Sequence, residues 1–146
     1  DMDTEGTLLP ETATAARRQY DSLESTATEV VREVAKAMEF GGDEYDQRVT
    51  DDVIETARDT LFASRLAVTI GTREEFEQWQ AEADHEVIEV GSEHVDNVVW
   101  HAPPATETAV AATFQDKQEA AVETLRRQAF GRLYRELLDE STEDEQ

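Results

Sequence analysis

The sequence predicts an α+β fold, in which N-terminal helices join a small, mostly antiparallel sheet covered by a long C-terminal helix. Two observations carry this prediction. Apolar residues recur with a helical period before residue 64 and after residue 116, and they occur in short strand-like segments between. Short links containing glycine or proline separate those segments, which favours antiparallel pairing of neighbouring strands.

The first two helices follow from apolar spacing and from the residues that begin and end helices. A weakly patterned helix is expected to begin near Pro10, because proline suits the first turn of a helix. From about 25 to 38 the apolar residues share one face, so this helix is expected to lie on a core. Gly41 and Gly42 are expected to end it.

A further helix is predicted after Thr50, a residue suited to capping a helix N-terminus. Residues 43–49 before it are expected to form a short helical turn. The predicted buried side chains of the new helix are Val53, Ile54, Ala57 and Leu61.

Strands are expected near residues 66–70, 86–90, 95–102 and 108–114. Between the first two, Thr72 and Glu75 form a capping box for a short helix. Because the last three strands are joined by short links, we expect an antiparallel meander with helices on one side.

A long helix from about 116 to 138 closes the predicted fold, before an acidic tail from about 140 that is expected to fray. Phe130, Tyr134 and Leu138 form a second apolar stripe, which must meet the N-terminal helices or a second copy of the chain. With no repeat and no long linker, residues 1–146 are interpreted as one domain.

The charge is the strongest global signal. The chain carries 35 acidic and 13 basic residues, for a net charge of −22, and the acidic residues are spread along its whole length. Such a charge opposes compaction at ordinary ionic strength, but at about 1 M salt the Debye length falls to ~3 Å. The composition therefore predicts a halophilic, cytoplasmic protein with loosely bound cations. A mesophilic acidic protein and a disordered chain are the alternatives.

Several function classes are excluded or disfavoured. There is no cysteine, so disulfides and thiolate chemistry are absent. No apolar stretch approaches the ~20 residues of a membrane-spanning helix, and the acidity argues against nucleic acid as a partner. No catalytic residue, cofactor site or specific metal site can be assembled. The segment Glu93, His94 and Asp96 is the best metal candidate, and its spacing fixes no ligand set.

Three segments together resemble a known family: GTREEF at 71–76, VWHAPP at 99–104 and RRQAFG at 126–131. The chain is similar to a family of short, acidic haloarchaeal proteins of unassigned function. The likeness covers most of the chain outside the acidic tail. It implies a high-salt setting and no catalytic residues.

Arginines of the last helix are the first candidate site. Arg126 projects from the apolar face of that helix, where it either pairs internally with a carboxylate or contacts an anion or another subunit. Arg127, Gly131 and Arg135 are expected on the opposite, exposed face. Their charges either pair with an acidic helix or serve as interface or anion contacts. Gly131 costs stability unless something approaches it closely.

His101 is the second candidate. It alternates with Trp100 along one strand, so the tryptophan is predicted in the core and His101 on the other face. That face is either solvated or the wall of a pocket in which His101 acts as a base.

Taken together, these features favour a non-enzymatic protein that works by association, most simply as a homodimer. The alternative is a small-molecule or anion-binding protein, or a weak enzyme, that uses the His101 face. Nucleic-acid contact through the arginine strip is a third hypothesis.

Overall fold

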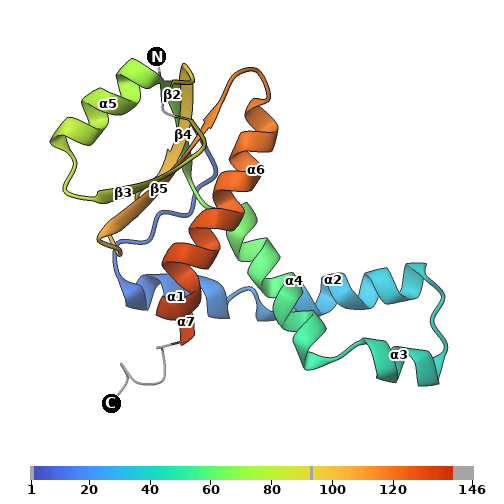
Figure 1. Cartoon of the computed structure of the whole chain (residues 1–146). Helices are drawn as coiled ribbons and strands as arrows, with labels where there is room; N and C mark the ends of the chain where they lie inside the picture. Colours follow the sequence, from blue (N-terminus) through green and yellow to red (C-terminus); the bar gives the residue numbers. More distant parts are fainter. Residues whose placement is uncertain (1, 93, 140–146) are drawn as a thin grey trace.

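A five-stranded sheet organises the chain in the computed structural model, which describes residues 2–92 and 94–139 (Figure 1). Its strands are β1 (Asp3–Glu5), β2 (Val68–Thr72), β3 (Glu86–Val90), β4 (Asn97–His101) and β5 (Thr108–Phe114). Their spatial order is β1-β2-β4-β5-β3. All neighbours are antiparallel except β3 and β5, which are parallel. Together with the helices, this confirms the predicted α+β class.

The predicted meander of the last three strands is wrong, because β5 lies between β4 and β3. Only β4 and β5 form the expected antiparallel pair. The link from β3 to β4 therefore passes the end of β5, and it does so in close contact. Gly91 has a φ of +107° and its Cα lies against Thr113, whose hydroxyl accepts a hydrogen bond from the Ser92 amide at 3.0 Å. A side chain at position 91 has no room there.

Arg73 holds the same link from the other side. Its two Nη atoms donate to both carboxylate oxygens of Glu89 on β3, at 3.1 and 3.0 Å. The guanidinium also donates to the carbonyls of Ser92 and Val95. One side chain thus joins β3 to the link, which compensates for the missing pairing between β3 and β4.

The helices begin largely where the sequence predicts. Their bounds are α1 (Ala13–Asp21), α2 (Glu24–Ala37), α3 (Gly42–Arg48), α4 (Asp51–Ser64), α5 (Arg73–Glu82), α6 (Gln118–Ala129) and α7 (Arg135–Asp139). Thr50 caps α4 through the amide of Val53, and Thr72 with Glu75 forms both bonds of the capping box at α5. The Thr50 cap and the capping box are confirmed.

The long C-terminal helix is not uniform. Residues Phe130–Tyr134 form a π-helical turn, η1, between α6 and α7. A π-turn advances fewer degrees per residue than an α-helix, so it rotates everything that follows relative to a straight helix. Nothing lies within 4 Å of a Cβ placed on Gly131, so no close approach explains that glycine.

Helices cover both faces of the sheet, not one as expected. On one face Val99 and Val110 pack under α6 and η1, and on the other Val98 and Trp100 pack against Phe76 of α5. Figure 1 shows α5 and α6 on opposite sides of the strands. The alternation along β4 therefore separates two apolar clusters and not a core from solvent.

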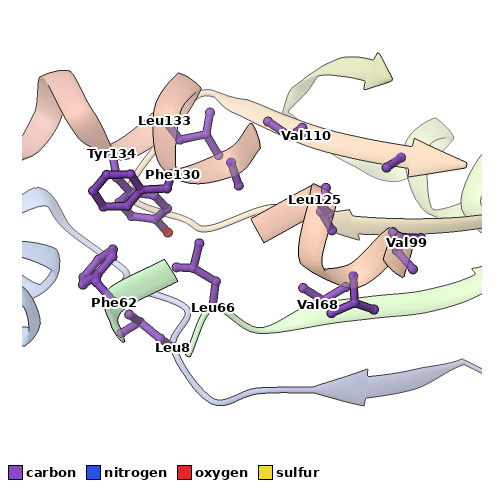
Figure 2. Packing of buried hydrophobic residues seen from close by; sticks show 14 of the residues in the cluster. Leu8, Phe62, Leu66, Val68, Val99, Val110, Leu125, Phe130, Leu133 and Tyr134 are labelled. Atoms are coloured by element: carbon purple, nitrogen blue, oxygen red, sulfur yellow. The ribbon is translucent and has the colours of Figure 1, made fainter. Parts of the chain in front are cut away.

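The larger cluster joins the C-terminal helix to the N-terminal helices (Figure 2). Phe62 of α4 is fully buried, and its ring meets those of Tyr20, Phe130 and Tyr134 edge-on at centroid distances of 5.1–5.9 Å. The second stripe of the C-terminal helix thus packs within the chain. The contacts among the described residues correspond to the intramolecular alternative, because Tyr134 is fully buried and Phe130 is only 5% exposed.

A helical arm, defined here as α2, α3 and the first half of α4, extends away from the sheet (Figure 1). Of α2, only Ala27 and Ala35 are buried, whereas Val30 and Val34 are 41 and 53% exposed. In α4 the buried residue is Phe62, and Val53 is exposed. The expectation that α2 lies with its whole apolar face on a core, and the predicted burial of Val53, are therefore wrong.

No helix within residues 2–92 and 94–139 combines the length and apolar character needed to cross a bilayer. The predicted fraying of the tail from residue 140 lies outside the described residues.

Candidate functional site

His101 lies inside the protein and not on an open sheet face. Its side chain is fully buried, 1% exposed as a residue, at the end of β4. Nδ1 donates to the carbonyl of Ala67 at 2.6 Å, and Nε2 accepts from the hydroxyl of Tyr134 at 2.7 Å. Because a carbonyl can only accept, the Ala67 contact fixes the neutral tautomer with the proton on Nδ1. His101 was expected either on a solvated face or in the wall of a pocket. Both expectations are wrong, because the side chain is buried.

The electrostatics of His101 agree with that geometry. Burial lowers its pKa to about 4, the nearby Arg126 charge adds to the decrease, and the bond to Ala67 opposes it. Burial also raises the pKa of Tyr134 above its ordinary value of 10.0, so the phenol remains a donor. Neither ring nitrogen is left to accept a proton from a substrate. The network orders the end of the core, and the hypothesis of a base acting at this face is not supported by the geometry.

Arg126 lies partly buried on α6, close to the N-terminal segment. Its Nε donates to the carbonyl of Leu66 at 3.0 Å, and its Nη2 lies 2.8 Å from where a Cβ on Gly6 would be. Within residues 2–92 and 94–139 it makes no ion pair. The sequence left open whether Arg126 pairs with an internal carboxylate or contacts an anion or another subunit. The internal ion pair does not form among the described residues, and the partner of Arg126 there is a backbone carbonyl.

Three arginines line one groove between α4 and the C-terminal helix, with a volume of about 620 Å³. The three are Arg126, Arg127 and Arg135. The apolar part of the wall is formed by Phe130 and Ala63. The sequence placed Arg127 and Arg135 opposite Arg126, on the assumption of 100° per residue throughout. The π-turn invalidates that assumption, because it rotates Arg135 relative to a straight helix. The π-turn thus accounts for the position of Arg135 alone, because Arg126 and Arg127 are consecutive residues of α6 and precede it; all three line one groove.

The groove also contains carboxylates. Asp59 of α4 accepts the Tyr20 hydroxyl at 2.6 Å, and its other oxygen lies 3.9 Å from Arg135 Nη1. Burial and Asp59 raise the pKa of Tyr20, which keeps that donor protonated. Glu123 also lines the groove and is exposed. The expected pairing of the arginines with an acidic helix is thus limited, in the described part of the chain, to one long contact at Arg135.

The helical arm is the second surface of interest. Six large apolar residues of the described chain are exposed, and four of them lie on the arm or at its end: Val30, Val34, Met38 and Val53. A shallow groove on α2 is lined by the first two together with Ser25, Thr26, Ala37 and two glutamates, Glu29 and Glu33. Hydrophobic spacing found this helix, but spacing cannot tell whether its apolar face meets its own chain.

Metal sites are not indicated by the part of the chain that the structure describes. No group of three or more His, Asp or Glu side chains there could hold an ion. Of the candidate segment Glu93, His94 and Asp96, residue 93 lies outside the described residues. Sequence reasoning also missed Arg73 and Phe62, which have structural roles. Nothing in their spacing predicts the partners they reach.

The fold and these surfaces define the class of protein: an α+β domain with an arginine-lined groove, an exposed apolar helix and a buried, neutral histidine. Residues 7–135 match a family described as a family of unknown function, DUF5809, and the chain belongs to that family. This agrees with the resemblance to a family without assigned activity. No curated protein and no solved structure shows significant similarity to the chain.

Proposed function

We propose that this protein acts without catalysis, by association, and that the helical arm forms a homodimer through α2. The observation that carries the proposal is the exposure of Val30 and Val34 on a chain with a net charge of −22. Both valines lie one turn apart on the same stripe. Apolar side chains grouped on a projecting helix are typical of an interaction surface, whereas single exposed ones need no explanation.

A second copy of the chain is the partner that the charges of α2 favour. Glu29 lies near the start of the exposed face and Lys36 near its end, and neither forms an ion pair with any described residue. On a helical wheel they lie on the same flank of the stripe that contains Val30, Val34 and Ala37. A two-fold axis that pairs two α2 helices antiparallel brings Glu29 of one copy opposite Lys36 of the other. The same arrangement packs Val30 against Val34 and Ala37 of the partner.

The setting proposed for this association is the cytoplasm of a halophile, such as a haloarchaeon. In molar salt the repulsion between two chains of charge −22 is screened to within about 3 Å, while hydrophobic contacts persist. The exposed carboxylates would hold cations loosely and in no fixed geometry. The same acidity supports the proposal that neither nucleic acid nor a membrane is a partner.

The test is the mass in solution in molar potassium chloride, measured by light scattering on a sizing column. We expect twice the 16.4 kDa of the chain for the wild type. Val34→Glu should give a monomer with an unchanged circular dichroism spectrum, because the side chain is exposed in the chain itself. Leu9→Glu is the matched control, since Leu9 is also exposed, at 44%, but lies off the arm.

Charge reversal tests the antiparallel geometry. Lys36→Glu should weaken the dimer, and adding Glu29→Lys should restore it, because the double variant exchanges the two members of the pair. A monomeric wild type would refute the homodimer. A dimer that tolerates Val34→Glu would place the interface elsewhere, and failure of the double variant to recover would exclude antiparallel pairing.

A further inference from the structure

We propose that the arginine groove, defined by Arg126, Arg127, Arg135, Phe130 and Ala63, binds a small organic anion. The ligand class is a molecule with a carboxylate or phosphate group attached to an apolar body. This site is separate from the α2 stripe, and the inference does not depend on the homodimer. It rests on the charge of the groove, the fixed position of Arg126 and the nature of the wall.

The charge of the groove is unusual for this chain. Acidic residues outnumber basic ones by 35 to 13, yet three arginines and only two carboxylates, Asp59 and Glu123, line the groove. Three arginines elsewhere have carboxylate partners within 3.2 Å: Arg48 with Glu44, Arg58 with Asp21 and Arg73 with Glu89. Arg126 and Arg127, by contrast, make no ion pair within residues 2–92 and 94–139. Three guanidinium groups against two carboxylates leave this groove with an excess of positive charge, to which an external anion can bind.

Arg126 is held in place before any ligand arrives. Its Nε is committed to the Leu66 carbonyl, and Gly6, at a φ of +88°, allows the backbone to lie against Nη2. Binding of an anion therefore costs less conformational entropy, because this side chain is already ordered. Among the described residues Arg127 donates one long hydrogen bond, of 3.4 Å to the Thr124 hydroxyl, and its side chain is exposed, so it can turn toward a ligand.

The wall of the groove selects for more than charge. The ring of Phe130 lies beside the arginines, and the guanidinium of Arg135 is 5.1 Å from its centroid. Ala63 continues this apolar surface on α4. A groove of about 620 Å³ lies within the size range of small-molecule sites. Bare phosphate or acetate would use the guanidinium groups but leave this wall in water.

Two carboxylates oppose an anion, and they differ in their effect. The charge of Asp59 is engaged by Tyr20 and, at longer range, by Arg135. Glu123 lines the groove and forms no ion pair in the described part of the chain. Its negative charge therefore weakens the binding of an anion. Removal of the Glu123 charge should raise the affinity of the groove for the anion.

The experiment titrates the full chain in molar potassium chloride with four probes: phenyl phosphate, benzoate, inorganic phosphate and benzyl alcohol. Binding is followed by nuclear magnetic resonance, through the Nε–H signals of the arginines. We expect phenyl phosphate or benzoate to saturate the groove, and comparison of the two decides between phosphate and carboxylate. Inorganic phosphate and the neutral alcohol should bind at least about tenfold more weakly, since each lacks one part of the contact.

Variants locate the site. Arg127→Met and Arg135→Met should each weaken binding of the better probe by about tenfold, and Glu123→Gln should strengthen it. Arg132→Met is the matched control, because Arg132 is an exposed arginine on the same helix that donates to Gln128 and does not line the groove. Absence of saturation by both aromatic anions overturns the proposal. Equal affinity for inorganic phosphate and phenyl phosphate, or equal losses in Arg132→Met and Arg135→Met, overturns it as well.

Discussion

Burial of neutral His101 makes the stability of the protein depend on pH in a defined direction. The pKa of His101 falls from its ordinary 6.5 to about 4 in the folded state, because charging it inside the core is unfavourable. Above pH 6.5 both folded and unfolded states hold a neutral ring, so His101 adds no pH dependence. Below pH 6.5 the unfolded state takes up a proton that the folded state refuses, and stability is lost until the pH approaches 4.

The magnitude follows from the width of that window. Each pH unit within it costs about 1.4 kcal/mol, so lowering the pH from 6.5 to about 5.0 should remove about 2 kcal/mol of unfolding free energy. The pH of about 5.0 is chosen because it stays above the sequence pI of about 4.2. The many carboxylates also titrate as the pH falls, so the wild type alone does not isolate this effect.

His101→Gln isolates it. A carboxamide keeps one donor and one acceptor but does not titrate. Urea unfolding in molar potassium chloride, followed by tryptophan fluorescence, gives the unfolding free energies of both proteins at about pH 7.5 and about pH 5.0. The advantage of the wild type over the variant should shrink by about 2 kcal/mol between the two pH values. A difference that stays constant would refute the burial of a neutral His101.

Three further predictions concern stability. Tyr134→Phe removes the donor to His101 Nε2 and should lower the unfolding free energy by about 1–3 kcal/mol in the same urea assay. Gly6→Ala should destabilise by more than about 1 kcal/mol, because φ is +88° and the new Cβ would lie 2.5 Å from the Leu66 carbonyl oxygen. An unchanged midpoint in either variant would contradict the local geometry. Dialysis from molar salt to low salt should weaken the helical circular dichroism and lower the melting temperature, because the net charge of −22 is then unscreened. Equal melting temperatures in both conditions would exclude salt-dependent folding.

Local signals in the sequence predicted local structure well. The Thr50 cap and the capping box at Thr72 and Glu75 depend on residues three positions apart, and both form as expected. The insertion of β5 between β4 and β3 depends instead on contacts far apart in the chain. A short link favours a hairpin, and no local pattern indicates that Arg73 bridges to Glu89 and replaces that pairing.

The candidate site was predicted in its residue types but not in its geometry. Arg126 was singled out because a guanidinium on an apolar face needs a partner, and it has one in the Leu66 carbonyl. Arg126 and Arg135 line the same groove because a π-turn lies between them. Helical periodicity does not predict this, because it assumes the same rotation per residue along the whole helix. His101 was expected outside the core because alternation assigns one face of a strand to solvent. That rule fails when helices cover both faces of the sheet.

The two proposed surfaces share α4, and this makes their independence testable. The first half of α4 supports α2 in the arm, and its second half contributes Ala63 to the arginine groove. Val34 does not line that groove. We therefore expect Val34→Glu to abolish the dimer while binding of the aromatic anion continues with unchanged affinity, measured by the same titration on the monomer. Loss of both properties together would show that the second copy completes the groove, because no residue of the groove itself has been altered.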